Sequence, residues 1–147
     1  MDNNSKTYND FIEQNAKTIN KLMALPILAS LLIGPLCALL KFLKVFEVMS
    51  YASCFICMGL SAVVFGIHFA MVKSNNDSRN TAMIIMVLLE AIIVYMRAVG
   101  FNVSVAAFIV PMLSLLYCNK KMYLTISAVC FAGLLIGMFL SRGHWGE

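Results

Sequence analysis

Long apolar runs alternate with short polar segments along this chain. Runs of nineteen, twenty-five and nineteen residues that contain no Lys, Arg, Asp or Glu cover 22–40, 48–72 and 122–140. An apolar run of about 18 residues or more is long enough to cross a bilayer as a helix. The pattern therefore predicts three membrane-spanning helices from these runs alone.

Two further runs, 81–96 and 101–118, are weaker, because only four residues separate them and the first has sixteen residues. Sixteen helical residues cover roughly 24 Å, which is short of a hydrocarbon core of about 30 Å. The pair either crosses twice or forms a re-entrant hairpin. Both alternatives return the chain to the same side, and we count five spans.

The polar segment 1–21 precedes the first run and carries no pattern typical of a cleavable signal peptide. Tyr8, Phe11, Ile12, Ile19 and Leu22 recur there at helical spacing. This spacing predicts a short amphipathic helix on the membrane surface. The expected fold is all-α: a polytopic transmembrane helix bundle over 22–140, followed by a short tail, 141–147.

Composition supports this class, since 61% of the residues are hydrophobic and 12% are charged. Soluble domains have roughly 45–50% apolar and about 25% charged residues. The net charge of +4 comes without a basic stripe of interleaved aromatic residues, which excludes a nucleic-acid partner. The expected partner is the lipid bilayer.

Lysines and arginines predict the orientation. Seven lie on the side of the N terminus, namely Lys6, Lys17, Lys21, Lys73, Arg79, Lys120 and Lys121. Four lie on the opposite side, namely Lys41, Lys44, Arg97 and Arg142. The excess favours a cytoplasmic N terminus in an inner or plasma membrane, with Glu147 outside after five crossings.

Glu90 is the main candidate for chemistry, because a carboxylate at mid-bilayer is costly and is by default a functional-site hypothesis. Arg97 shares its helical face but lies about 10.5 Å further along the axis, so a direct bridge is strained. Glu90 either staples helices together or senses a proton, a cation or a ligand.

Two prolines offer Glu90 another partner, because each frees the carbonyl four residues earlier. Pro35 frees Leu31 and Pro111 frees Ala107, both at a depth similar to that of Glu90. A protonated Glu90 could donate a hydrogen bond to one of these carbonyls. The prolines are also candidate positions for helix kinks.

His68 is a further sensing candidate, but it lies only about 6 Å deep and matches Glu90 poorly. Cys54 and Cys57 form a C-x-x-C motif typical of redox and metal sites. No second C-x-x-C and no nearby histidine completes a ligand set, so we expect no metal and no cofactor. The two cysteines remain weak candidates.

Gly133 and Gly137 form a G-x-x-x-G motif, whose spacing predicts that the last span crosses another helix closely. That helix belongs either to the same chain or to a second subunit.

Three stretches carry a resemblance to a known class of protein: "FIEQNAKTINKLMALPILASLLIGPLCALL", "GIHFAMV" and "VPMLSLLYCNKKMYLTIS". In order, they resemble the N-terminal membrane region of bacterial signalling proteins such as GGDEF diguanylate cyclases, histidine kinases and chemotaxis-receptor-like proteins. In such proteins about six helices precede a cytoplasmic output domain, whereas this sequence ends at "SRGHWGE" after the fifth run. The resemblance implies a sensing and anchoring role within a homo-oligomer, with an output domain in cis if the chain is a fragment.

Two alternatives remain open, a small transporter or permease component and an accessory membrane subunit. No glycine-rich phosphate loop, H-E-x-x-H or G-x-S-x-G motif occurs. We therefore expect no catalytic residues and no enzyme activity from this chain itself.

Overall fold

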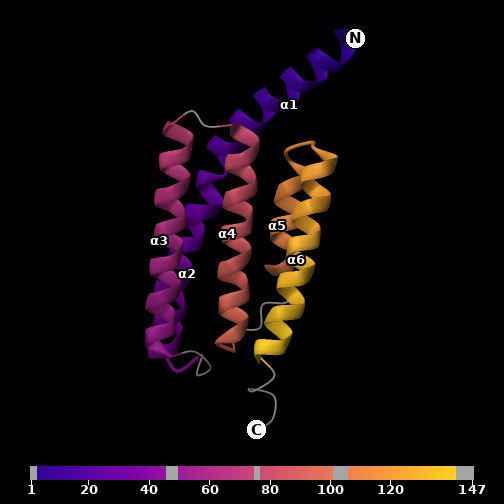
Figure 1. Cartoon of the computed structure of the whole chain (residues 1–147). Coiled ribbons are helices and arrows are strands. Elements are labelled where there is room, and N and C mark those ends of the chain that lie inside the picture. Colours follow the sequence, from indigo (N-terminus) through magenta and orange to yellow (C-terminus); the bar gives the residue numbers. More distant parts are fainter. Residues whose placement is uncertain (1–2, 46–49, 75–76, 101–105, 142–147) are drawn as a thin grey trace.

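The computed structural model describes residues 3–45, 50–74, 77–100 and 106–141, and in these ranges all regular structure is helical. This confirms the predicted all-α class. Figure 1 shows long helices side by side along a common axis, with the short α5 beside α6. The helices are α1 Asn3–Leu22, α2 Ala24–Phe42, α3 Tyr51–Lys73, α4 Ser78–Ala98, α5 Ala106–Leu115 and α6 Lys120–Ser141.

Polar caps define where three of the helices begin. Ser50 before α3, Asp77 before α4 and Asn119 before α6 each accept a hydrogen bond from a backbone N–H two or three residues on, at 3.0, 3.0 and 3.1 Å. Such caps satisfy backbone donors that have no partner inside the helix. After α4, Gly100 takes a φ of 88°, a left-handed conformation that ends a helix and favours glycine.

The junction between α1 and α2 is a single turn at Met23. Pro26 lacks a backbone N–H, so the helical hydrogen bond to the Leu22 carbonyl cannot form. The chain changes direction there, and α1 diverges from the axis of α2 (Figure 1).

The predicted amphipathic helix is present in α1, but it also packs against the bundle. Ile12, Ala16 and Asn20, at a spacing of four residues, are buried. Tyr8 and Phe11 are each 57% exposed. The apolar residues are therefore divided between the bundle and the surroundings, because a continuous stripe at four-residue spacing faces the other helices.

The shortness assigned to 81–96 was wrong. Polar residues at both ends extend this run into α4, which has 21 residues and covers about 31 Å. The short member of the pair is α5, whose ten residues cover about 15 Å. Residues 101–105 of the predicted 101–118 lie outside the described residues.

Helix α4 is the centre of the bundle. It packs against α3 on one side and α6 on the other, and it also contacts α1 and α5. Ten of its residues are buried, against five in α3 and five in α6. One face of the middle of α4, which includes Met86 and Leu89, is therefore enclosed by protein.

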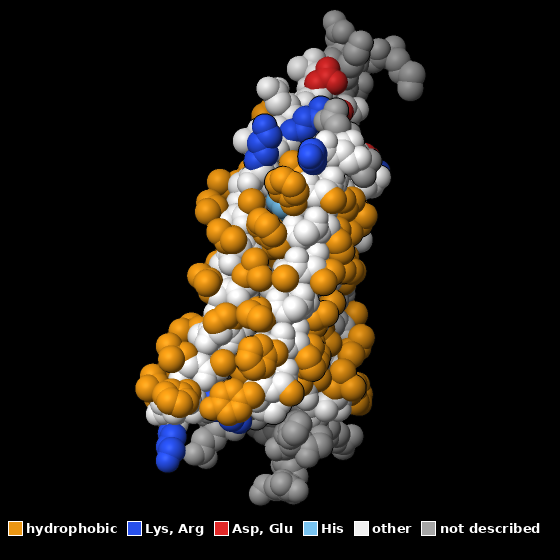
Figure 2. Space-filling view, turned by 90° about the vertical axis from the view of Figure 1, so that its left-hand side faces the viewer, with side chains coloured by type: hydrophobic (Ala, Val, Ile, Leu, Met, Phe, Trp, Pro, Cys, Tyr) orange, Lys and Arg blue, Asp and Glu red, His pale blue; other side chains and the backbone are white. Residues whose placement is uncertain are grey.

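The outer surface has the distribution of apolar and charged side chains that is typical of a membrane protein. Figure 2 shows large apolar side chains around the middle of the bundle and Lys and Arg side chains toward its ends. Leu32, Phe55 and Phe131 are 62–67% exposed. Within the described residues, four helical segments are long and apolar enough to cross a membrane: 7–42, which joins α1 to α2, then α3, α4 and α6. The chain is therefore a multi-pass membrane protein.

Candidate functional site

Glu90 lies in the tight contact between α4 and α6, and only 3% of it is exposed. On α6, its nearest neighbours are Gly133 and Cys130, and the Cys130 thiol is its hydrogen-bonding neighbour. Arg97 lies two turns further along α4, is 8% exposed and packs against Gly137. We call these five residues the α4–α6 seam.

The two glycines of the G-x-x-x-G motif make room for the two polar side chains. A Cβ added to Gly133 would lie 2.8 Å from Glu90 Oε1, and one added to Gly137 would lie 3.0 Å from Arg97 Cδ. Any larger residue at either position would displace these side chains. The close crossing predicted from the motif is therefore formed within the chain, and it places Glu90 and Arg97 against the backbone of α6.

The polar atoms of the seam are incompletely paired. Neither Glu90 Oε2 nor Arg97 Nε has a hydrogen-bond partner within the described residues, although both atoms are buried. Among those residues the two side chains also form no ion pair within 4.0 Å, as the strained geometry predicted. A buried polar atom without a partner costs about 1–3 kcal/mol. The seam therefore contains one acceptor and one donor that could still form hydrogen bonds.

The Leu31 carbonyl, which Pro35 frees, does not explain the position of Glu90. Its carboxyl group lies against α6, and no hydrogen bond to Leu31 of α2 is formed. Ala107 lies where side chains are not described, so that alternative stays a prediction. Pro35 and Pro111 both lie inside continuous helices.

His68 belongs to a second polar cluster, at the opposite end of the bundle from Arg97. Its Nε2 lies 2.8 Å from the Asn20 carbonyl oxygen at the end of α1. Asn20 Nδ2 donates to the Ser78 carbonyl at 2.8 Å, and Tyr117 Oη donates to Asn20 Oδ1 at 2.7 Å. We call these four residues the Asn20 hub. It joins α1, α3, α4 and the turn after α5.

The sequence reasoning missed Asn20 and Tyr117. A signal for Asn20 was present, because it follows Ile12 and Ala16 at four-residue spacing and so continues an apolar stripe. A polar residue on such a stripe indicates a buried hydrogen-bonding group. No comparable local signal marked Tyr117.

Cys54 and Cys57 lie near Cys37 where α2 packs closely on α3. Gly34 permits this approach, since a Cβ there would lie 2.7 Å from the Cys54 carbonyl oxygen. All three cysteines are buried and free. No group of three His, Cys, Asp or Glu residues suited to a metal ion is found in the described part of the chain.

The seam can change its charge and its number of hydrogen-bond donors when Glu90 gains or loses a proton. The hub differs in its pairing, because the amide of Asn20 is bonded on both its oxygen and its nitrogen. Comparisons of the chain with protein-family models, with curated proteins and with solved structures find no match. A function must therefore be argued from these two clusters.

Proposed function

We propose that this chain is the membrane-embedded sensory and anchoring module of a bacterial signalling protein, and that proton exchange at Glu90 changes the packing of α4 against α6. The chain itself is not an enzyme. If the chain is part of a longer protein, an output domain in cis, such as a diguanylate cyclase or a histidine kinase, would supply the chemistry. The homo-oligomer implied by the sequence resemblance is part of this proposal.

The observation that carries the proposal is the pair of buried, unpartnered atoms, Glu90 Oε2 and Arg97 Nε. A structural staple would have its polar atoms satisfied, because an incomplete buried network is less stable than an apolar contact. Atoms left unpaired in one packing can find partners in another. This brings two arrangements of the seam close in free energy, as a switch requires.

The geometry of the seam couples the two groups to helix position. Because Gly133 and Gly137 offer no side chains, Glu90 and Arg97 touch the α6 backbone region directly. A change in charge at Glu90 alters its attraction to Arg97, which the same helix carries two turns away. We expect α6 to shift by about 1–2 Å relative to α4, the scale of helix shifts in switching proteins.

The test measures the distance between spin labels on α4 and α6 in nanodiscs at pH 5 and pH 8. Val87 and Ile136 are exposed label positions on the two helices, 42% and 53% respectively. We expect the mean distance to change with pH in the otherwise native protein and to be constant in Glu90→Gln. Labels at Leu32 and Phe55 on α2 and α3 provide the control, since that contact contains no ionisable carboxyl group.

A distance that ignores pH, or a shift that survives Glu90→Gln, would contradict sensing at Glu90. Proton flux into proteoliposomes that Glu90→Gln abolishes would instead favour the transporter alternative. If correctly inserted Glu90→Gln gives the same distances and the same proton flux as the native protein, Glu90 only holds the helices together.

The orientation is a second part of the proposal. The lysine excess places α1, the α3–α4 link and the start of α6 in the cytoplasm. In a chain without its native cysteines, we expect Lys120→Cys to react with a membrane-impermeant maleimide only from the cytoplasmic side. Val99→Cys, after α4, should react from the other side, and the reverse pattern would invert the orientation.

A further inference from the structure

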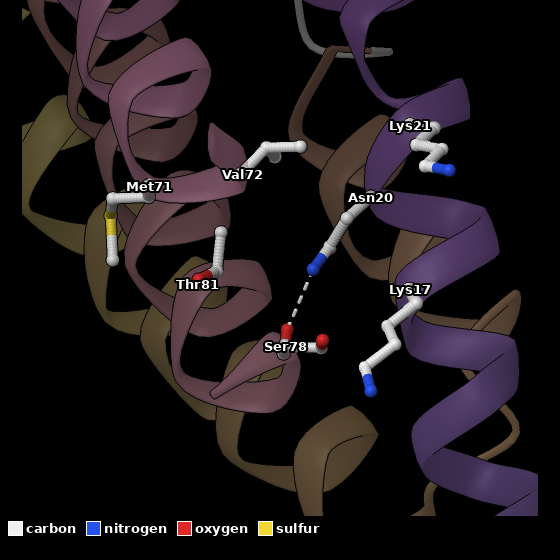
Figure 3. A pocket seen from close by; sticks show the side chains of 7 residues that line it. All are labelled: Lys17, Asn20, Lys21, Met71, Val72, Ser78 and Thr81. Atoms are coloured by element: carbon white, nitrogen blue, oxygen red, sulfur yellow. Dashed lines mark hydrogen bonds between the residues drawn. The ribbon is translucent and has the colours of Figure 1, made fainter. Parts of the chain in front are cut away.

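A pocket of about 160 Å³ opens between α1, α3 and α4, next to the Asn20 hub. Figure 3 shows side chains of α1 on one side of it and side chains of α3 and α4 on the other. The residues that line it are Lys17, Lys21, Asn20, Met71, Val72, Ser78 and Thr81. We propose that this pocket binds the phosphate group of an anionic lipid headgroup.

The first argument is charge. Lys17 and Lys21 lie one turn apart on α1, so both can reach the same side of the helix. Opposite them, Ser78 is the first residue of α4, and the positive end of the helix dipole favours an anion there. Two lysines and the first residue of a helix thus line one small pocket.

The second argument is a polar group without a partner. Thr81 lines the pocket and is 1% exposed, yet its hydroxyl makes no hydrogen bond within the described residues. The Asn20 amide nitrogen beside it is already bonded to the Ser78 carbonyl (Figure 3). A phosphate oxygen is the kind of acceptor that this hydroxyl lacks.

The third argument is position, which favours a lipid over a free anion. The pocket lies at the end of the bundle that carries Lys17 and Lys21, and Figure 2 shows that the apolar middle of the surface gives way to Lys and Arg side chains toward the ends. Met71 and Val72 give it an apolar wall from α3. Basic residues at such a boundary attract anionic headgroups, while apolar side chains contact the acyl region.

Two carboxylates near the pocket oppose the binding of a phosphate group, and one of them provides a further variant for the test. Glu13 pairs with Lys17 at 3.1 Å, with both side chains more than half exposed, and Asp77 caps α4. A bound phosphate would have to share Lys17 with Glu13. Glu13→Gln should therefore tighten binding.

The experiment titrates the purified protein in a neutral detergent with dihexanoyl phosphatidylglycerol and measures the dissociation constant by calorimetry. Attraction of a basic side chain to an anionic lipid surface is worth about fivefold in affinity per residue. We expect the dissociation constant to rise about tenfold or more in Lys17→Gln/Lys21→Gln. Lys120→Gln/Lys121→Gln removes the same charge at the same end of the bundle, outside the pocket, and should change it by less than twofold.

Thr81→Val keeps the shape of the side chain and tests the pocket without altering charge. We expect it to weaken binding several-fold, while phosphatidylcholine of the same chain length binds more weakly to every variant. The site would be overturned if both lysine-pair variants lost the same affinity for phosphatidylglycerol. It would also be overturned if Lys17→Gln/Lys21→Gln and Thr81→Val both kept the native affinity. Inorganic phosphate that binds as tightly as phosphatidylglycerol would overturn the assignment to a lipid and identify a free anion as the ligand.

Discussion

The α4–α6 seam and the Asn20 hub are both buried polar clusters, but they differ in how completely their atoms are paired. In the hub, Asn20 joins three other residues through hydrogen bonds of 2.7–2.8 Å. In the seam, an oxygen of Glu90 and a nitrogen of Arg97 have no partner among the described residues. A satisfied network fixes one arrangement of helices, whereas an unsatisfied one leaves alternatives close in free energy. Under the proposed function, the hub anchors the helices and the seam is the part that switches.

The largest expected effect is in the hub. Asn20→Leu removes two side-chain hydrogen bonds and leaves the Ser78 carbonyl and the Tyr117 hydroxyl without their partner. We expect the free energy of unfolding to fall by about 2–3 kcal/mol. Unfolding in mixed micelles provides the measurement.

Asn15→Leu is the matched control, because Asn15 makes one exposed bond, to the Leu116 carbonyl at 2.9 Å. It should cost about 1 kcal/mol or less, since water can replace the lost partner. An equal loss in both variants would mean that the hub contributes nothing beyond an ordinary surface contact.

The next effect concerns the glycines of the seam. Gly133→Ala places a methyl group 2.8 Å from Glu90 Oε1 and 3.0 Å from Val94 Cγ2, so Glu90 must move. We expect a loss of about 1–2 kcal/mol in the free energy of unfolding, from overpacking. Gly59→Ala on α3 meets no atom within 4 Å and should be neutral or stabilising by up to about 1 kcal/mol.

A double-mutant cycle sharpens this comparison. Glu90→Ala removes the atoms nearest to the added methyl group, so the cost of Gly133→Ala should shrink in that background. Costs that simply add would show that Gly133 and Glu90 do not interact.

The last comparison makes one conservative change in each cluster. Tyr117→Phe deletes a satisfied hydrogen bond to Asn20 and should cost about 1–2 kcal/mol. Glu90→Gln keeps the shape of a side chain that already has an unpaired oxygen, and it should change the free energy of unfolding by about 0.5 kcal/mol or less. If Glu90→Gln proves the more destabilising change, the seam is the anchor and the two assignments must be exchanged.

Local patterns predicted much of the fold. Four of the five apolar runs correspond to helices long enough to cross a membrane, whereas the run 101–118 contains the ten-residue α5, and the spacing of Gly133 and Gly137 identified a close crossing. The helical rise also indicated correctly that Glu90 and Arg97 would not form a direct bridge. These predictions succeeded because each depends on the geometry of a single helix.

The length of α4 shows where local reasoning failed. An apolar run measures only the part of a helix with apolar residues, and α4 continues through polar residues at both ends. Likewise, the apolar residues of α1 were expected on one face, but contact with the bundle selected the stripe of Ile12, Ala16 and Asn20.

The sequence by itself determined the membrane class, the helical segments and the presence of a carboxyl group inside an apolar run. Only the tertiary structure decided that Glu90 faces α6, that Tyr117 bonds Asn20 across 97 positions, and that two lysines of α1 share a pocket with the start of α4. The physical reason is that helix formation in a membrane satisfies backbone groups within each segment. The choice of neighbour depends instead on shape and hydrogen bonding between segments that are distant in sequence.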